Sequence, residues 1–403
     1  MKTSDYDIIL LGLFRWNGPY SSISIAMAKE FAKSNRVFYI NHPFSFKDYY
    51  KNEMGLDKSK TSLFNNQTSF SKAENIPGEL ISVTPPLTLP INVLPKGTLY
   101  NIANRYNLRL IHQVIQKTIK SYNIKQYIYI NCFDPFYAPI LPKKFQPVLN
   151  IYQSVDDISQ SSYTAKHGVY LEEEAIKKAD LTLVTSTELY KLKSPFTKNI
   201  YILNNAADTS NFKKALEVDF PKPEALESIK GKIIGYIGNL DESRVNYPLL
   251  KQLAIAHPNK TLLLVGPINN SIYKEIGLDQ LPNVVFTGGM SIEALPPYLK
   301  YFDCAIIPFN CNTLTKSIYP LKINEYLAAG KAVVATNFSE DIQSFKDHIY
   351  LAKDEDTFVK LVGEAVNDSS PETIKRRVHL AEQNTWTARI EQFWNIVENH
   401  LSH

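Results

Sequence analysis

Two charged residues three positions apart, Lys322 and Glu325, could together recognise a nucleotide diphosphate. They follow Pro320, which suits the first turn of a helix because its missing N–H would have no intrahelical acceptor there. On such a helix both side chains lie on one face near the N-terminus, where free N–H groups and the helix dipole favour an anion. Lys322 adds a point charge for a phosphate, and Glu325 can accept hydrogen bonds from two sugar hydroxyls. The alternative is an ordinary amphipathic helix with an i,i+3 salt bridge.

A second set of groups could stabilise the charge that develops on a leaving diphosphate. Arg244 follows a strand-end glycine, Gly238, in the segment Gly-Asn-Leu-Asp-Glu-Ser-Arg. A cation or a backbone N–H group aimed at the leaving oxygen lowers the barrier. We therefore expect Arg244, Lys322 and the N–H groups of Gly238 and of residues 316–322 to act without a metal. The alternative for Arg244 is an ordinary surface arginine.

Three aspartates could take the proton that an acceptor hydroxyl must lose. Asp134 follows a predicted strand over residues 126–131, and Asp156 and Asp157 follow another over residues 148–153. Ligands of parallel α/β sheets lie outside the carboxyl ends of the strands, which is where all three fall. Adjacent Asp156 and Asp157 point in different directions, so at most one is expected to face a ligand. Each aspartate could instead cap a turn.

The acidic triplet Asp354-Glu355-Asp356 has the D-x-D form of a metal-binding motif. It precedes the helix-type residues 357–359, and acidic residues in the first turn of a helix favour its dipole. We therefore interpret it as a helix start and predict no metal ligand.

The elements that position these residues form two successive alternations of strand and helix. The first opens with an apolar strand over 7–13, a loop that contains Gly18 and a helix over 23–33, as in a Rossmann-like unit. Gly18 would let the backbone approach a ligand closely, although a plain turn is the alternative. The loop lacks the G-x-G-x-x-G spacing, so we predict no NAD-type site. The second alternation begins at residue 232.

Domain boundaries follow from chain length and from the polar segment 213–230. A chain of 403 residues is too long for one core. We expect an N-terminal domain at 1–205, a second domain at 206–373 and a helical segment at 374–403. Residues 45–80 are polar and predict an irregular excursion.

A long helix is predicted over residues 98–122. Its expected buried side consists of Leu99, Ile102, Tyr106, Leu110, Val114 and Ile115. A basic face is formed by Arg105, Arg109 and His112, with Lys117 and Lys120 nearby. That face is either a solvated surface or a contact for anionic lipid or a lipid diphosphate.

Composition excludes several classes of protein. Hydrophobic residues make up 44% and charged residues 21% of the chain, as in soluble globular proteins. A net charge of +4 does not indicate a nucleic-acid partner. The three cysteines show no metal-type spacing, which favours a reducing compartment. No apolar run approaches the roughly 18 residues of a spanning helix, and the N-terminus lacks the form of a signal peptide. We expect a cytoplasmic protein.

Residues 320–336 read P-L-K-x-x-E-Y-L-A-A-G-K-x-V-V-A-T and resemble the donor-site segment of GT-B glycosyltransferases, in the broad family 4-like group that builds bacterial surface polysaccharides. The runs ADLTLVTS (179–186) and ILNNAADTSNF (202–212) resemble the same group, including proteins for teichuronic-acid-type polymers. In that family the Glu matching Glu325 grips the ribose of the donor. Many relatives carry a second Glu eight residues earlier, where this chain has Ser317.

The resemblance implies an α/β protein of the GT-B class: two Rossmann-like doubly wound domains that face a cleft, with the C-terminal helix crossing back to the N-domain. It implies a metal-independent transfer of sugar from a nucleotide diphosphate sugar, with a UDP-sugar as the expected donor and no further cofactor. The acceptor would be a polysaccharide or lipid-linked saccharide, with the enzyme possible at the inner face of an anionic plasma membrane. The expected donor-binding residues are Gly18, Gly238, Arg244, Gly266, Ser317, Leu321, Lys322 and Glu325.

Two alternatives stay open at this point. A nucleotide-sugar 2-epimerase of the same fold would show a fuller set of acidic and histidine residues around the cleft. A catalytically degenerate nucleotide-sugar-binding subunit is favoured by Ser317 in place of Glu.

Overall fold

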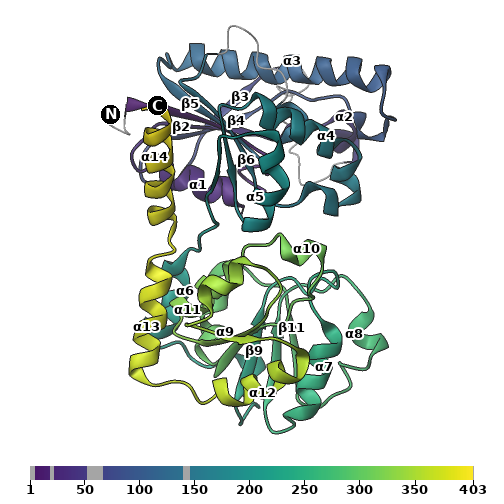
Figure 1. The fold of residues 1–403 in the computed structure, drawn as a ribbon, viewed down its shortest axis with the longest axis vertical. Coiled ribbons are helices and arrows are strands. Elements are labelled where there is room, and N and C mark those ends of the chain that lie inside the picture. The colour runs from purple at the N-terminus through teal and green to yellow at the C-terminus, as the bar shows by residue number, and fades with distance from the viewer. Residues whose placement is uncertain (1–4, 19–21, 52–66, 139–145, 403) are drawn as a thin grey trace. The chain divides into compact units, whose positions relative to one another are not determined.

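The computed structural model describes residues 5–18, 22–51, 67–138 and 146–402, and Figure 1 traces the chain in order. The chain divides into two units, one made of Met1–Asn204 with Ile390–His403 and the other of Asn205–Arg389. The sequence predicts domain boundaries at residues 205 and 373. The structure instead continues the second unit to residue 389, so only the last part of the C-terminal segment belongs to the first unit.

The described part of the first unit contains an eight-stranded sheet in the order β3-β4-β2-β1-β5-β6-β7-β8. Neighbouring strands are parallel, except that β3 is antiparallel to β4. Apart from β3, this order is that of a doubly wound Rossmann-like sheet, as predicted. The strands are β1 (Asp7–Gly12), β2 (Val37–Asn41), β3 (Ser69–Lys72), β4 (Leu80–Thr84), β5 (Tyr127–Cys132), β6 (Leu149–Ser154), β7 (Leu181–Val184) and β8 (Ile200–Ile202).

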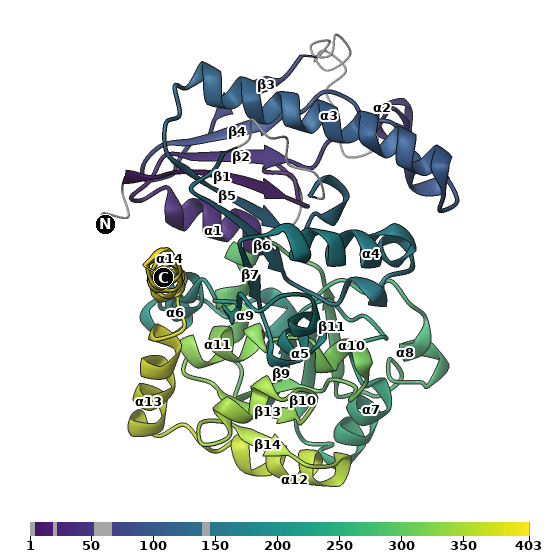
Figure 2. The ribbon, with the colours of Figure 1, turned by 45° about the horizontal axis from the view of Figure 1, so that its top comes forward.

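Helices cover both faces of this sheet, so its strands are nearly continuous apolar runs. α1 and α3 lie on opposite faces in Figure 2. Ser22 caps α1 by accepting from the N–H of Ile25 at 3.3 Å. The helices of this unit are α1 (Ile23–Phe31), α2 (Phe46–Lys51), α3 (Thr98–Ser121), α4 (Ser162–Lys178) and α5 (Thr187–Lys193). The 3-10 turns η4 (Ile91–Val93), η5 (Pro135–Tyr137), η6 (Ile158–Gln160) and η7 (Ser194–Phe196) complete it.

The excursion predicted at residues 45–80 is wrong where the structure describes it. Residues 46–51 form α2, which the side chain of Asp48 supports by accepting from the N–H of Ser45 at 2.8 Å. Residues 69–72 form the edge strand β3 because their backbone pairs with β4. The remainder, residues 52–66, lies outside the described part of the chain.

The second unit contains a six-stranded, wholly parallel sheet in the order β11-β10-β9-β12-β13-β14. Numbered within the unit, this is 3-2-1-4-5-6, the order of a doubly wound nucleotide-binding fold. The strands are β9 (Ile233–Ile237), β10 (Thr261–Val265), β11 (Val284–Gly288), β12 (Cys304–Ile307), β13 (Ala332–Thr336) and β14 (Tyr350–Ala352). The helices are α6 (Thr209–Glu217), α7 (Tyr247–Ala256), α8 (Ile272–Glu275), α9 (Leu295–Lys300), α10 (Thr313–Lys316), α11 (Leu321–Ala328), α12 (Glu355–Ala365) and α13 (Pro371–Glu382). Short 3-10 turns are η8 (Glu224–Leu226), η9 (Ile292–Ala294) and η10 (Asp341–Phe345).

The C-terminal segment is two helices rather than one. α13 stays in the second unit, where Arg377 donates to the carbonyl oxygen of Gly330 at 3.2 Å. The chain then leaves helical geometry at Asn384, whose carbonyl oxygen accepts from the N–H of Ala207 at 3.4 Å. α14 (Trp386–Leu401) follows, and its residues from 390 onward belong to the first unit. No helix in the described ranges combines the length and apolarity needed to cross a bilayer.

Candidate functional site

The strand order of the second unit reverses between β9 and β12, and ligands of such sheets bind outside the carboxyl ends of the strands at this point. β9 ends at Gly238, whose N–H donates to the carbonyl oxygen of Val265 at 2.8 Å. Gly238 has φ of 152° and Gly266 has φ of 150°, where only glycine is at ease. A Cβ atom on Gly266 would overlap the carbonyl oxygen of Gly238. The two glycines therefore allow the ends of β9 and β10 to lie close together. The N–H of Gly238 was predicted to bind a phosphate, but it is already bonded to Val265.

Lys322 reaches the end of β9 from the first turn of α11. A Cβ atom on Gly238 would lie 2.6 Å from Nζ of Lys322, and Nζ lies 5.9 Å from the centre of the Tyr236 ring. Pro320 is the N-cap of α11 and offers no side-chain cap. The N–H of Lys322 has no acceptor among the described residues. The free N–H of Lys322 and its ammonium group therefore both lie at the start of α11, near the strand end.

Glu325 lies one turn further along the same face of α11. It is partly buried, and among the described residues its carboxylate makes neither a hydrogen bond nor an ion pair. Burial raises the pKa of Glu325; the charge of Lys322 opposes this shift, and that of Asp208 adds to it. The salt bridge between Lys322 and Glu325 that the simple-helix alternative requires is not formed. Glu325 is thus an unpartnered acceptor beside a cation.

Arg244 lies in the loop that follows β9. Its side chain is exposed, while its carbonyl oxygen accepts from the N–H of Asn310 at 2.7 Å. Asn310 follows β12, so this bond joins the loops on either side of the switch point. Burial raises the pKa of Tyr236, and the charges of Arg244 and Glu325 act on it with opposite signs. Gly238 and Lys322 therefore lie near Tyr236 at the carboxyl end of β9, and the charges of Arg244 and Glu325 reach the same tyrosine.

The loop before α11 offers fewer donors than predicted. Ser317 is buried, and its hydroxyl donates to the carbonyl oxygen of Leu314 at 2.8 Å. Its N–H donates to the same oxygen at 3.3 Å, and the N–H of Leu321 donates to Tyr319 at 2.8 Å. The hydroxyl and N–H of Ser317 and the N–H of Leu321 are thus used within local turns. These groups are therefore not available to donate to a bound phosphate.

In the first unit the strand order reverses between β1 and β5, and Asp134 lies just beyond β5. Its side chain is fully buried at 0% exposure. Asn131 brackets it, accepting from its N–H and donating to its carbonyl oxygen, each at 2.9 Å. Phe133 between them has φ of 61°, a left-handed conformation that is strained for a phenylalanine. Asp134 is therefore held firmly, but its carboxylate is too deep to touch an acceptor itself.

His42, which the sequence reasoning missed, is the exposed partner of Asp134. Nδ1 of His42 lies 2.7 Å from Oδ2 of Asp134, and the imidazole is 27% exposed. His42 directly follows β2, which pairs with β1. The sequence could have indicated His42 by its position at the end of a predicted strand. Neighbouring strands of a parallel sheet bring their carboxyl ends to one edge, so His42 is expected near the residues that follow the other strands.

Asp157, another predicted acid–base candidate, has a local role. Asp157 caps η6, with Oδ1 accepting from the N–H of Ser159 at 3.0 Å and Oδ2 from the Gln160 amide at 3.0 Å. This is the turn-capping alternative. Asp156 is exposed beside it.

Gly18 lies in the first loop, whose residues 19–21 are outside the described part of the chain. Its N–H donates to the carbonyl oxygen of Arg15 at 2.9 Å, which closes a turn. A Cβ atom on Gly18 would lie 3.0 Å from that same oxygen.

The acidic triplet at residues 354–356 starts α12, as predicted. Asp354 is the N-cap, and its carboxylate accepts from the N–H of Thr357 at 2.7 Å. Glu355 accepts from Asn246 at 2.7 Å and Asp356 from Gln252 at 2.9 Å. The three carboxylates therefore have structural partners.

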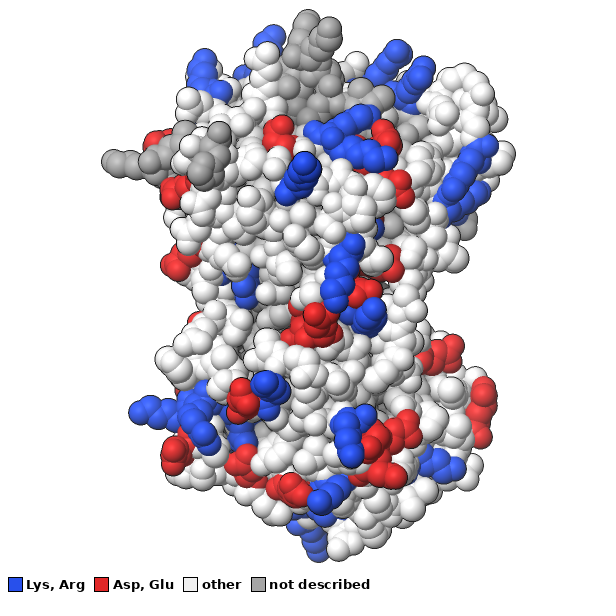
Figure 3. All heavy atoms as spheres, in the orientation of Figure 1, with Lys and Arg blue, Asp and Glu red and all other residues white. Residues whose placement is uncertain are grey.

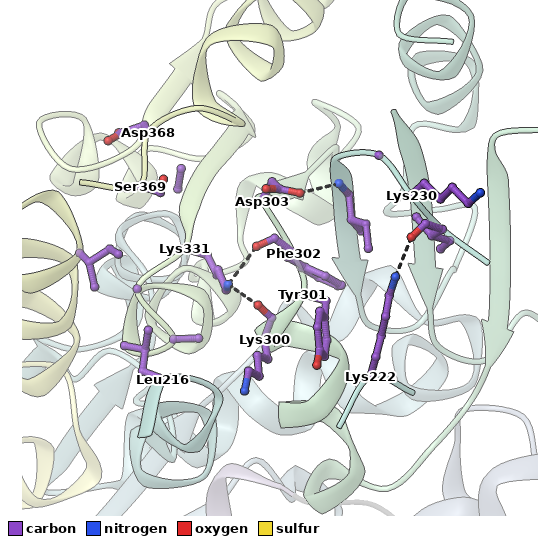
Figure 4. Close-up of a pocket in the computed structure, with 17 residues that line it drawn as sticks. Leu216, Lys222, Lys230, Lys300, Tyr301, Phe302, Asp303, Lys331, Asp368 and Ser369 are labelled. Carbon is purple, nitrogen blue, oxygen red and sulfur yellow. Dashed lines mark hydrogen bonds between the residues drawn. The ribbon is translucent and has the colours of Figure 1, made fainter. Parts of the chain in front are cut away.

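A pocket of about 430 Å³ opens at the other edge of the second sheet, near the amino ends of β9, β12 and β13. Two of its lysines donate to backbone carbonyl oxygens, as Figure 4 shows. Nζ of Lys331 donates to the carbonyl oxygens of Lys300 and Phe302 at 2.8 and 2.9 Å, and Nζ of Lys222 to Ile229 at 2.6 Å. Ligands of such sheets bind at the carboxyl ends of the strands, and this pocket lies at the opposite ends.

Residues 231–368 match the model of the family described as Glycosyl transferases group 1. Over 177 residues the chain is 29% identical to a Bacillus subtilis strain 168 protein named "Putative teichuronic acid biosynthesis glycosyltransferase TuaH". The matched region covers 43% of this chain and 44% of that relative, so the match spans less than half of either protein.

Solved structures share the fold over nearly the whole chain. An α,α-trehalose-phosphate synthase (UDP-forming) from Burkholderia vietnamiensis has a TM-score of 0.68 at 8% identity, covering 99% of both chains. A sucrose-phosphate synthase from Thermosynechococcus elongatus has a TM-score of 0.65 at 14% identity, covering 98% of this chain and 99% of that one. Anabaena HepE in complex with UDP and glucose has a TM-score of 0.62 at 15% identity, covering 98% and 100%. The predicted GT-B fold class is confirmed.

Proposed function

We propose that this chain, which carries a glycosyl transferase group 1 domain in its second unit, transfers a sugar from a nucleotide diphosphate sugar to a hydroxyl group of a saccharide or lipid-linked acceptor. The observation that carries the proposal is the grouping of Lys322, whose backbone N–H has no acceptor among the described residues, with an unpartnered Glu325 at the switch point of a doubly wound sheet. An anion and a pair of sugar hydroxyls are the ligands that such groups suit.

Each group has a role in the proposed reaction. Glu325 accepts from the ribose hydroxyls of the donor, while Lys322 and the first turn of α11 hold the diphosphate. As the bond between sugar and phosphate breaks, negative charge grows on the diphosphate oxygen, and Lys322 and Arg244 stabilise it. With two cations available, we propose that transfer needs no divalent metal. A UDP-sugar is the proposed donor, because the names of two structural neighbours mention UDP.

The alternatives from sequence are less well supported. The matching family and the relatives named above include proteins described as transferases and synthases, and none of these names describes an epimerase. The serine at position 317 favours a degenerate binding subunit. Ser317 is buried, however, and the proposed transfer depends on Lys322, Arg244 and Glu325, all of which are present. A binding subunit would take up nucleotide without transferring sugar.

Calorimetric titration of the full chain with UDP, GDP and ADP, together with a transfer assay on the matching sugars, tests the function. Glu325→Ala should weaken nucleotide binding by about 1.5–3 kcal/mol, the range for hydrogen bonds to a charged group. Glu364→Ala, a change at an exposed glutamate on α12, is the matched control and should bind normally. Excess chelator should leave the turnover rate unchanged.

Two results would contradict the proposal. Unchanged nucleotide affinity in a folded Glu325→Ala variant would show that Glu325 does not contact the ribose. Activity that disappears with chelator and returns with manganese would show that the cations do not suffice.

We further propose that the enzyme works at an anionic membrane surface, which α3 contacts. The predicted burial of this helix is wrong over its first half, where Leu99 and Ile102 are 64% and 60% exposed. Arg105 and Arg109 are exposed beside them, whereas His112 is buried, and this lowers its pKa to about 4. Lys and Arg side chains lie over α3 at the top of Figure 3. An exposed surface that is both apolar and basic suits an anionic bilayer.

A further inference from the structure

A groove of about 340 Å³ lies beside α1, and the proposed transfer assigns it no role. Three segments line it: the loop after β1, which carries Trp16, the helix α1 with the residues that follow it, and the turn between β3 and β4. We call it the α1 groove. All three segments belong to the first unit, so the groove is complete within that unit.

Trp16 is held in place through its backbone and through its ring. Its N–H donates to Oδ1 of Asn41 at 2.7 Å, and Nδ2 of Asn41 donates to the carbonyl oxygen of Val83 on β4 at 3.0 Å. The indole meets Tyr39 of β2 edge-on, with 5.4 Å between the ring centroids. Trp16 is half-buried and lines the groove, so a fixed aromatic surface is open to a ligand there.

The turn between β3 and β4 is fixed against the end of α1. Gly78 has φ of 100°, and a Cβ atom on it would overlap the carbonyl oxygen of Ala32, so the two backbones touch. The N–H of Ala73 donates to the carbonyl oxygen of Leu80 at 2.9 Å, which closes the hairpin. Asn75 has φ of 57°, a left-handed conformation that asparagine tolerates. Backbone packing therefore sets this wall of the groove.

The groove combines apolar surface with charged groups of both signs. Ile25, Ile76 and Pro77 supply the apolar part. Nζ of Lys33 lies 2.8 Å from Oε2 of Glu30, so these two charges compensate each other.

Lys29 and Glu74 are the other two charged residues of the lining, and both are exposed. Nζ of Lys29 lies 6.0 Å from the centre of the Trp16 ring. Among the described residues, neither Lys29 nor Glu74 forms a hydrogen bond or an ion pair. With two lysines and two glutamates the lining has no net charge, but it offers a free ammonium, a free carboxylate and the exposed amide of Asn75.

These groups suit a sugar ring better than other ligands. The C–H groups on one face of a sugar ring carry a slight positive charge and pack against the negative face of an aromatic ring. Each hydroxyl both donates and accepts, so it can bond to ammonium, carboxylate and amide groups. A phosphorylated ligand would favour a lining with net positive charge. The groove volume lies at the lower end of the range for small-ligand pockets, roughly 300–1,000 Å³.

We propose that the α1 groove binds neutral sugar units of the saccharide acceptor, with Trp16 as the surface on which a ring packs; the proposal rests on the glycosyl transfer proposed above. Lys29, Glu74 and Asn75 bond to the hydroxyls. The units held there are not the ones that react, so the groove favours acceptors that carry several sugars over single sugars.

Calorimetric titration of the full chain with neutral trisaccharides tests the binding. The panel contains α- and β-linked trimers of glucose, galactose and N-acetylglucosamine, with trigalacturonate as the acidic comparison. We expect saturable binding of a neutral trimer, and Trp16→Ala should weaken it about tenfold, the upper end for an aromatic contact. Asn75→Gly keeps the left-handed backbone but removes the amide, and should weaken binding by about two- to tenfold. Tyr190→Ala, at a 38% exposed aromatic residue on α5, is the matched control and should bind normally.

Transfer kinetics separate a binding role of Trp16 from a structural one. With an acceptor of several sugar units, Trp16→Ala should raise the acceptor KM about tenfold and leave kcat unchanged, because the groove does not touch the reacting bond. With a single-sugar acceptor the variant should match the wild type. UDP affinity should stay constant, since Lys322 and Glu325 lie in the second unit. Lys29→Ala and Asn75→Gly, at exposed positions, keep the test open if Trp16→Ala does not fold.

Several results would overturn the groove as a saccharide site. These are no saturable binding of any neutral trimer, equal binding by the wild type, Trp16→Ala and Asn75→Gly, tighter binding of trigalacturonate than of every neutral trimer, or a loss of kcat with both kinds of acceptor. A chain that binds UDP and transfers sugar but binds no trimer would overturn the groove alone. A chain that binds a trimer through Trp16 but neither binds UDP nor transfers sugar would overturn the proposed function alone.

Discussion

Glu325 combines a chemical role with a cost to the fold. Its carboxylate is partly buried without a partner among the described residues, and burial raises its pKa. A folded-state pKa above the ordinary value of about 4.3 means that the contribution of this group to stability is lost as pH rises through the raised value. Above this raised pKa the ionised Glu325 therefore weakens the unliganded fold. Such a residue is explained by a ligand that supplies the missing hydrogen bonds.

We expect Glu325→Gln to unfold at a higher temperature than the wild type at neutral pH and to bind nucleotide less tightly. The stability difference should shrink as pH falls below the raised pKa, because the wild-type group is then neutral as well. Thermal unfolding at several pH values, with and without UDP, measures both effects. A variant that is less stable than the wild type at neutral pH would mean that Glu325 has an internal partner in solution.

At the scale of elements, α3 is longer than the sheet it covers. It has 24 residues, about 36 Å at 1.5 Å per residue, whereas β5 has 6 residues, about 20 Å. Its C-terminal half packs on the sheet through Leu108, Ile111, Val114 and Ile115. The N-terminal half of α3, which extends beyond the sheet, buries the polar residue Asn107. The side chain of Asn107 accepts from the N–H of Leu89 at 2.9 Å and donates to its carbonyl oxygen at 3.0 Å. Leu99, Ile102 and Tyr106 of that half are exposed, whereas Tyr100 is buried.

We expect the protein to co-sediment with anionic vesicles at low salt and to be released at high salt. Replacing Arg105 and Arg109 together by Gln should weaken this binding by about 2 kcal/mol, at about 1 kcal/mol for each basic group. Ile102→Glu should abolish it, while Ile255→Glu on α7 should not, although Ile255 is similarly exposed at 58%. Equal binding to neutral and anionic vesicles would contradict the proposed surface. So would the absence of binding to either kind of vesicle.

At the scale of the whole molecule, the chain end completes the core of the first unit. Phe393 of α14 is fully buried, and its ring lies 4.9 Å from that of Phe31 on α1. Trp394 lies 6.4 Å from Tyr6, at the start of the chain. The first unit is therefore finished only after the second has been made, since residues 205–389 lie between its two segments.

We expect Phe393→Ala to destabilise the first unit by about 3–5 kcal/mol, the range for truncating a buried aromatic side chain. Nucleotide binding by the second unit should change little, because Phe393 does not belong to it. Urea unfolding followed by tryptophan fluorescence, beside UDP titration, measures the two units separately. Ile255→Ala, at an exposed site, is the control. Equal loss of stability in both units would show that they unfold as one.

The sequence by itself determined the features that depend on neighbours along the chain. The alternation of apolar strands and helices gave both doubly wound sheets, because burial on two faces needs continuous apolar strands. Gly330 ends α11 with φ of 68°, and Asp354 caps α12, since these roles involve only adjacent residues. The placement of Lys322 and Glu325 on one face of α11 follows from helical spacing alone.

The tertiary structure decided everything that joins distant segments. His42 and Asp134 are 92 positions apart, and only the order of the parallel strands brings them within 2.7 Å. The exposure of Leu99 and Ile102 depends on how far α3 extends beyond the sheet. The position of α13 depends on the hydrogen bond from Arg377 to the carbonyl oxygen of Gly330. Periodicity states which face of a helix is apolar, but the partner packed against that helix decides which face is covered.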